Sequence, residues 1–198
     1  MSTIFRLAEP QDAQQILDIY TPNVLHTVIS FELQPPSVEE MLRRITSTLS
    51  QHPWLVCKQD EKILGYVYAS SYRPRAAYQW AVEVTAYVHP DARRMGVGRA
   101  LYQSLFSILR LQGYFQAFAG IALPNPGSVG LHEAMGFQPI GVYRSVGYKL
   151  GAWHDVGWWQ LTLQELASPP MPPKPLNQAI SSPDWDAAMH SGIPHLKI

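Results

Sequence analysis

The 198-residue sequence has little of several features that mark whole classes of protein. Its single cysteine, Cys57, excludes an internal disulfide, and its seven histidines include no pair at the spacing of metal ligands. No apolar run approaches the roughly 20 residues that a membrane-spanning helix needs. Free cysteine in an apolar run, here residues 54–57, is usually buried, so we interpret Cys57 as a structural thiol rather than a nucleophile. We therefore expect a soluble, cytoplasmic protein with no metal site and no membrane partner.

An excess of charge of either sign is also missing. Lys+Arg and Asp+Glu each number 15, which gives a formal net charge of +0 at pH 7 with neutral histidine. A protein that neutralises a phosphate backbone needs an excess of basic residues. We therefore expect no nucleic-acid partner.

What is present divides the chain into a body, residues 1–166, and a tail, residues 167–198. The body has regular apolar periodicity, and a hydrophobic content of 46% over the whole chain is enough for a substantial core. The tail begins with a proline-rich run and continues with polar residues, glycine and proline, so we expect it to be extended or partly disordered. Trp185 and Ile193 offer the alternative that it is anchored to the body or to a partner subunit.

The apolar patterns of the body predict an α+β domain in which strands dominate. Runs rich in β-formers predict strands over residues 4–7, 54–58, 63–70, 81–88 and 115–122, and a pair of strands within 142–163. Helical spacing predicts helices that begin at Pro10 and after Ser37, one over 97–111 and a short one over 128–135.

The most informative stretch, residues 82–101, joins a strand to a helix through a turn that holds Gly96 and Gly98. Glycines let the backbone approach a ligand, and the unpaired amides of the first helical turn attract an anion together with the helix dipole. Arg94 and Arg99 would add positive charge. The stretch is neither a Walker loop nor the dinucleotide fingerprint. Because any tight turn before a helix can contain Gly-x-Gly, the pattern alone leaves a structural role open.

The wider motif resembles a known family. Residues 93–98, Arg-Arg-Met-Gly-Val-Gly, resemble the pyrophosphate loop of the GCN5-related N-acetyltransferases (GNAT), and the Asn-x-x-Ser of 125–128 and the segment 131–137 fall where that family has related elements. Residues 77–88 and the distinctive run 147–157 are similar to the phosphinothricin and methionine-sulfoximine acetyltransferases. The resemblance covers roughly residues 3–164. It implies the GNAT fold, a mixed, mostly antiparallel central sheet with splayed central strands and flanking helices.

The resemblance also implies a reaction and a binding site. An acetyl group would pass from acetyl-CoA directly to the amino group of a small amino-acid-like acceptor, in a ternary complex and without a metal. Twelve residues would contact the cofactor: Ala86, Tyr87, Val88, Arg93, Arg94, Met95, Gly96, Val97, Gly98, Arg99, Asn125 and Ser128. Four would contact the acceptor: Phe31, Arg73, Arg75 and Tyr78. Family members differ at the arginine loop, and some have a basic residue in place of Glu32, so the identity of the acceptor stays open.

Two residues are candidates for proton transfer. An acceptor amine is mostly protonated near neutrality and needs a base before it can attack a thioester. Glu83 lies in mid-strand, on the face opposite the apolar Val82 and Val84. From the sequence alone it could equally be a solvated or salt-bridged glutamate, and the resemblance favours the base. His132 would ordinarily be a packed or solvent-facing helix residue, whereas the resemblance implies that it lines the acceptor pocket and handles protons.

The same family implies a homodimer. Residues 147–159 are rich in aromatic side chains and would help to form the neighbouring subunit's pocket, although Trp158 and Trp159 could equally belong to the core. Two other functions stay open. One is an acetyltransferase for another amine, such as a peptide N-terminus or a polyamine, although Arg73 and Arg75 disfavour a polyamine. The other is a non-catalytic acyl-CoA-binding sensor that keeps the turn at 93–98 but has no turnover.

Overall fold

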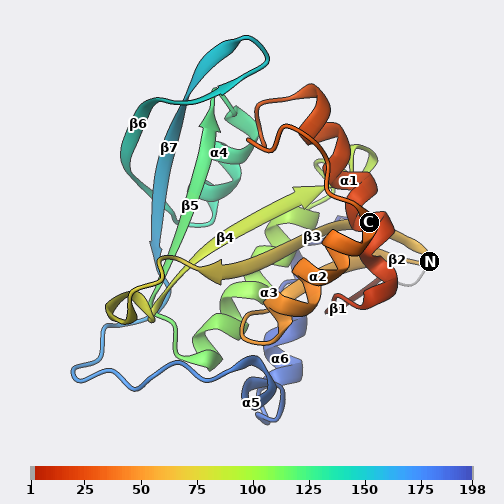
Figure 1. The fold of residues 1–198 in the computed structure, drawn as a ribbon. Helices are drawn as coiled ribbons and strands as arrows, with labels where there is room; N and C mark the ends of the chain where they lie inside the picture. Colours follow the sequence, from red (N-terminus) through yellow and green to blue (C-terminus); the bar gives the residue numbers. More distant parts are fainter. Residues whose placement is uncertain (1–2, 198) are drawn as a thin grey trace.

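The computed structural model describes residues 3–197, which form one seven-stranded sheet with helices on both faces (Figure 1). The outermost ends of the predicted body and tail, residues 1, 2 and 198, lie outside the described residues. The strands are β1 (Thr3–Leu7), β2 (Trp54–Gln59), β3 (Lys62–Ser71), β4 (Ala81–Val88), β5 (Gln116–Leu123), β6 (Gln138–Lys149) and β7 (Ala152–Thr162). The α-helices are α1 (Ala13–His26), α2 (Val38–Leu49), α3 (Val97–Gln112), α4 (Pro126–Ala134), α5 (Leu176–Ile180) and α6 (Trp185–His190). Short 3₁₀ turns are η1 (Pro10–Asp12), η2 (Ala76–Tyr78), η3 (Pro90–Ala92) and η4 (Ile193–His195).

The sheet has the spatial order β1-β2-β3-β4-β5-β7-β6 and is mostly antiparallel, as predicted. Its parallel pair, β4 and β5, is joined only over residues 81–83 and 116–118. By contrast, β4 pairs with β3 as far as Val88, and β5 pairs with β7 as far as Leu123. The two central strands therefore separate toward their carboxyl ends (Figure 1), which confirms the splay.

Two clusters of buried apolar side chains lie on opposite faces of this sheet. Alternation along β2 shows the division, because Leu55 and Cys57 join the cluster under α3, whereas Trp54 and Val56 join the cluster under α1 and α2. Cys57 is fully buried, and burial raises the pKa of its thiol to about 12, in agreement with a structural role. No helix within residues 3–197 is long and apolar enough to cross a membrane.

Local signals placed the start of α2 correctly and the start of α1 three residues too early. Ser37 is the N-cap of α2, and its hydroxyl accepts a hydrogen bond from the Glu40 amide at 3.2 Å. The return bond of a capping box is replaced, because the Glu40 carboxylate binds Arg43 and Arg44 instead. Pro10 opens a 3₁₀ turn that leads into α1 rather than the helix itself.

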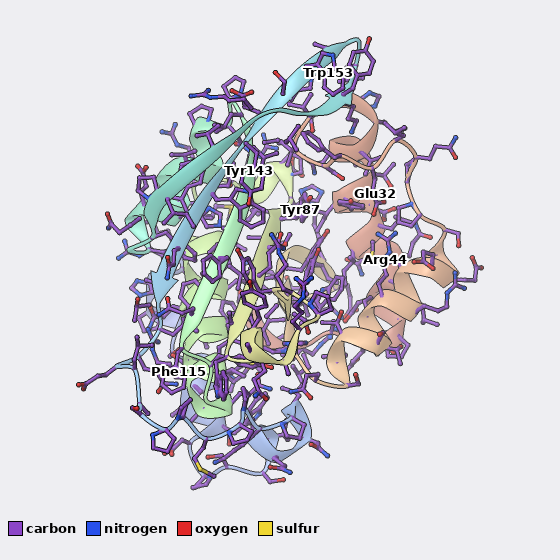
Figure 2. The ribbon with its side chains drawn as sticks, turned by 60° about the vertical axis from the view of Figure 1, so that its left-hand side comes forward. Glu32, Arg44, Tyr87, Phe115, Tyr143 and Trp153 are labelled. Atoms are coloured by element: carbon purple, nitrogen blue, oxygen red, sulfur yellow. The ribbon has the colours of Figure 1, made fainter. Side chains whose placement is uncertain are left out.

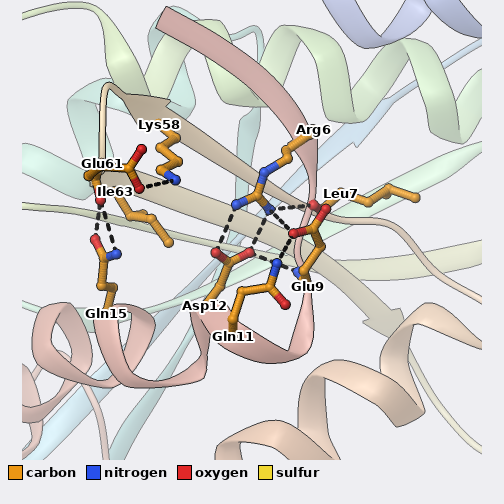
Figure 3. Close-up of polar contacts among 9 residues, drawn as sticks. All are labelled: Arg6, Leu7, Glu9, Gln11, Asp12, Gln15, Lys58, Glu61 and Ile63. Atoms are coloured by element: carbon orange, nitrogen blue, oxygen red, sulfur yellow. Dashed lines mark hydrogen bonds and ion pairs between the residues drawn. The ribbon is translucent and has the colours of Figure 1, made fainter.

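The start of α1 is fastened to the sheet by polar contacts (Figure 3). Arg6 of β1 forms a bidentate ion pair with the buried Asp12, with N–O distances of 2.6 and 2.8 Å, and this hydrogen bond raises the pKa of Arg6. Gln15 of α1 donates to the Glu61 carbonyl and accepts from the Ile63 amide at the β2–β3 turn. Bidentate and well-satisfied contacts of this kind fix the helix position as well as stabilise it.

The tail corrects one expectation. Instead of being extended or partly disordered throughout, it forms α5, α6 and η4. Leu176, Ala179, Ala188 and Met189 are buried. Of the two anchors in the alternative, Trp185 packs against the core, whereas Ile193 is 39% exposed. The physical reason is that α3 leaves apolar surface uncovered on its outer side, and these widely spaced side chains cover it. The prolines and polar residues between them obscured the pattern.

Candidate active site

The glycine turn lies between β4 and α3 and brings seven predicted cofactor residues, 93–99, into one short segment. Arg94 and Gly96 have left-handed backbone conformations, with φ of 64° and 79°. Gly96 is the N-cap of α3 and has no side chain that could cap the helix. The first amides of α3 therefore point outward without an intrahelical partner. Such amides, backed by the helix dipole, suit the pyrophosphate of a cofactor. The side chains of Arg93 and Arg99 are exposed beside them.

The splayed part of β4 offers further donors. The His89 amide donates to the Leu64 carbonyl of β3 at 2.8 Å. Because amides alternate in direction along a strand, those of Ala86 and Val88 point away from β3, toward the gap that β5 leaves. This geometry supports the predicted backbone contacts of these two residues. The predicted cofactor contact of Tyr87 has no such support, because its side chain lies on the α1 side, edge-on to Tyr20 with ring centroids 5.1 Å apart.

The start of α4 borders the same gap. Asn125 is the N-cap of this helix, and its Oδ1 accepts from the Ser128 amide at 3.1 Å. A hydrogen bond from Asn125 to the cofactor arm would therefore use its Nδ2 amide. Gly98 keeps α3 close to α4, since a Cβ there would lie 3.1 Å from the Leu131 side chain. The contacts of Asn125 and Ser128 with a cofactor stay predictions.

His132 is placed as a packed histidine. It is 4% exposed, its Nε2 is 2.9 Å from the Tyr102 hydroxyl, and its Nδ1 is 2.8 Å from the Ser128 carbonyl. Burial lowers its pKa, and the bond to the Ser128 backbone opposes that shift. His132 lines neither of the two cavities described below. These contacts join α4 to α3, and a part for His132 in proton transfer stays a prediction.

Glu83 occupies the position that alternation predicted. It lies on β4, directly opposite Ser70 of β3, and is half-buried rather than fully solvated. Burial raises the pKa of its carboxyl, and the positive charge of Arg73 partly opposes this. A carboxylate with a raised pKa is a better proton acceptor near neutrality, so the setting suits a general base.

The arginine loop before β4 carries three of the four predicted acceptor residues. Arg73, Arg75 and Tyr78 line a cavity of about 260 Å³. The guanidinium of Arg73 lies over the Tyr72 ring, 4.4 Å from its centroid, which fixes the direction of this otherwise exposed side chain. The loop therefore presents cationic groups, and one of them, Arg73, is close enough for its charge to lower the pKa of Glu83.

A second, larger cavity of about 670 Å³ lies between the α1–α2 layer and the sheet. Its sheet wall is aromatic and its helix wall is charged: Tyr20, Trp54, Tyr66, Tyr68, Tyr87, Ser70, Glu32, Glu40, Arg43 and Arg44 line it. Figure 2 shows Glu32 and Arg44 on the helix side and Tyr87 on the sheet side. Arg44 binds Glu32 at 2.6 Å and Glu40 at 2.9 Å. Because Ser70 lines the cavity and faces Glu83 across the strands, the candidate base borders it.

The β6–β7 hairpin closes one end of this region. Phe31 packs against Gly147 so tightly that a Cβ there would overlap its ring, and the ring centroid lies 6.4 Å from that of His154. Lys149 is 4% exposed and donates from Nζ to the carbonyls of Val24 and Ser30, each at 2.6 Å. Phe31 thus contacts the hairpin, which also holds the loop that carries it, whereas the three arginine-loop residues line the smaller cavity.

The part of the chain that the structure describes holds no group of three His, Cys, Asp or Glu side chains arranged to bind a metal ion. The candidate functional groups are backbone amides, one half-buried carboxylate and several guanidinium groups.

Comparison with known proteins was made on both sequence and structure. Residues 5–158 match the family described as Acetyltransferase (GNAT) domain. The chain is 37% identical to the phosphinothricin N-acetyltransferase of Streptomyces viridochromogenes over 173 residues, 87% of this chain and 94% of that protein. It is 32% identical to the L-methionine sulfoximine/L-methionine sulfone acetyltransferase of Salmonella typhimurium over 165 residues, 83% of this chain and 96% of that protein.

Among solved structures, a GNAT superfamily phosphinothricin acetyltransferase from Sinorhizobium meliloti in complex with AcCoA is similar at a TM-score of 0.80 and 34% identity. The alignment covers 88% of this chain and 94% of that one. A putative acetyltransferase from Salmonella typhimurium with its cofactor acetyl-CoA has the same TM-score at 30% identity, over 84% of this chain and 97% of that one.

Proposed function

The chain belongs to the GNAT acetyltransferases and is an acetyl-CoA-dependent N-acetyltransferase, and from this premise we propose that it acetylates the amino group of a small amino acid of the phosphinothricin or methionine-sulfoximine type. The observation that carries the proposal is Glu83, a half-buried carboxylate with a raised pKa at the last paired position before β4 and β5 separate, opposite Ser70 of the larger cavity. The names of the relatives support this choice of acceptor.

Acetyl-CoA, when bound, supplies the thioester whose acetyl group is transferred. The first amides of α3 would hold its pyrophosphate, and the amides of Ala86 and Val88 would hold its arm. Glu83 would take a proton from the acceptor ammonium, directly or through a water, which frees the amine to attack the thioester carbonyl. The new C–N bond would form as the C–S bond breaks, and a second amine proton would go to the departing thiolate, so that the products are the N-acetylated acceptor and free CoA thiol.

Recognition of an amino acid also needs a partner for the carboxylate of the acceptor. Guanidinium groups match carboxylates bidentately, and Arg73 and Arg75 stand exposed beside the cavity they line. Arg44 is already paired with Glu32 and Glu40, so its charge is compensated. The same pairing compensates the two glutamates, which argues against a polycationic acceptor in the larger cavity.

A homodimer is the corresponding proposal for assembly. β6 is exposed along nearly its whole length, and the hairpin presents large apolar side chains, including Tyr143, Tyr148 and Trp153, which are 51%, 59% and 65% exposed. Figure 2 shows Tyr143 and Trp153 on this hairpin. An apolar surface of this kind is typical of a protein–protein contact.

A cytoplasmic location is the matching expectation for an enzyme with this donor and one buried, unpaired cysteine.

The test is acetyl-CoA-dependent thiol release by the purified protein with phosphinothricin, methionine sulfoximine, the common amino acids, a short peptide and spermidine. Release with the first two, lost in an Arg73→Ala variant, is the expected result. Release only with the peptide or spermidine would overturn the acceptor class but keep the transfer reaction. Binding of CoA without release for any amine would support the sensor alternative.

A further inference from the structure

The chain beyond the family-matched part runs back along the whole of α3. At the end of α3 the Lys174 amide donates to the Gln112 carbonyl at 2.7 Å, and at its start the Lys197 amide donates to the Met95 carbonyl at 2.9 Å. Figure 1 shows α5 and α6, in blue, beside the green α3. The matched family region ends at residue 158, so this segment is an addition to it.

The segment is seated by specific contacts. The Ser191 hydroxyl donates to the Ser107 hydroxyl at 2.9 Å, and the Gly192 amide donates to the Ser104 hydroxyl at 3.1 Å. A Cβ at Gly192 would collide with the Ala100 carbonyl, so the two backbones are as close as glycine allows. The C-terminal segment therefore packs on α3 through contacts that depend on specific residues of both segments.

Its last residues reach the phosphate-binding turn itself. Gly96, the N-cap of α3, faces the backbone of His195, and a Cβ at Gly96 would collide with the His195 carbonyl. The Leu196 Cα would lie 3.4 Å from the same Cβ. Together with the bond from Lys197 to Met95, these contacts hold two consecutive residues of the turn. The glycine that predicted the approach of a ligand thus also permits the approach of this chain's own C-terminal segment.

We propose that residues 185–197, the C-terminal strap, are positioning residues that hold the turn at 93–98 in the conformation that binds the phosphates of acetyl-CoA. The turn needs such support, because the left-handed region is unfavourable for a non-glycine residue, here Arg94. A turn that is only partly in the binding conformation lowers the apparent affinity by that fraction. The inference concerns the cofactor side and is independent of which acceptor is used.

A matched pair of variants isolates the contact. Lys197→Pro removes the amide that binds Met95, whereas Lys197→Ala keeps it. A third protein, residues 1–191, lacks the end of the strap but retains α5, α6 and the buried Ala188 and Met189. Thermal unfolding of each variant shows whether the fold is kept.

The readouts are the calorimetric Kd for CoA without acceptor, hydrogen exchange at residues 94–99, and the ratio of kcat/KM for acetyl-CoA to that for S-acetylpantetheine, which has no phosphate. We expect Kd for CoA to rise about tenfold in the truncated chain and by several-fold in Lys197→Pro, as loss of one or two backbone hydrogen bonds predicts. Exchange should quicken, the ratio should fall by a similar factor, and Lys197→Ala should match the wild type.

Three results would overturn the proposal. One is an unchanged Kd for CoA in the folded truncated chain. Another is a lower Kd, which would make the segment an obstacle rather than a support. The third is an equal loss of activity with both acetyl donors, which would make the strap a general stabiliser. Failure of the acceptor assignment would leave the CoA calorimetry untouched, so the two proposals fail separately.

Discussion

Replacing Lys149 with methionine tests how the hairpin shapes the acceptor side. Lys149 is 4% exposed, and its Nζ joins β6 to the end of α1 and the loop beyond it through the carbonyls of Val24 and Ser30. Burial lowers the pKa of Lys149, and the charge of Glu32 opposes the shift. Methionine keeps the length and the aliphatic contacts of lysine but removes both hydrogen bonds.

The expected loss follows from those two bonds. A hydrogen bond to a charged group contributes about 1.5–3 kcal/mol, and the removal of a costly buried charge offsets part of the sum, so we expect a loss of about 2–4 kcal/mol in the free energy of unfolding. For a chain of this size that corresponds to a fall in Tm of roughly 5–15 °C. Lys62→Met is the matched control, since Lys62 is an exposed β3 lysine paired with Asp91 at 2.9 Å and should change stability by about 1 kcal/mol or less.

The functional consequence is confined to one substrate. The loop that Lys149 holds carries Phe31 and Glu32, whereas the phosphate-binding turn lies on α3. Below its unfolding temperature, Lys149→Met should raise the KM of the acceptor and leave the Kd for CoA unchanged. A variant as stable as Lys62→Met, or one in which affinity for both substrates falls together, would refute this reasoning.

Three further predictions concern two histidines and the exposed hairpin. Burial lowers the pKa of His52 from 6.5 to about 4. The folded state therefore binds fewer protons than the unfolded state, and the free energy of unfolding should fall by about 2 kcal/mol between pH 7 and pH 5. Denaturant titrations of His52→Gln should show a smaller fall, and a fall equal to that of the wild type would contradict the buried neutral state. His132→Ala should lower the free energy of unfolding by about 1–3 kcal/mol through the lost bond to Tyr102, and the pH profile of kcat/KM should not change. A loss of rate at unchanged stability would instead favour catalysis by His132. Trp153→Ser should shift a dimer toward monomer in sedimentation experiments, and a wild-type protein that is already monomeric would refute the assembly.

Local sequence signals were enough where neighbouring residues decide the structure. The strand at 81–88 was predicted to the residue, and the following helix to within one residue of its end. Alternation alone placed Glu83 on the correct face, because the period of a strand is fixed by backbone geometry. The glycine turn was equally local, since its two left-handed residues and the amides beyond them lie within a few positions.

Contacts between distant segments could not be predicted in the same way. The larger cavity is assembled from α1, α2 and three strands, so Tyr20, Arg44 and Trp54 carried no shared motif. The sequence alone could not show how His132 packs, because its partner, Tyr102, lies 30 residues earlier. The order of the tail could not be predicted for the same reason, because its few apolar residues form a pattern only together with the α3 surface that they cover.

The most direct test of acetyl transfer at this site compares the wild type with Glu83→Gln, using mass-spectrometric detection of the N-acetylated acceptor across a range of pH. Loss of a general base should lower kcat by about 10²–10⁴-fold at neutral pH with little change in the Kd for CoA. The wild-type rate should fall as pH drops through the raised pKa of Glu83. A Glu83→Gln variant that retains the full rate at neutral pH would contradict the account.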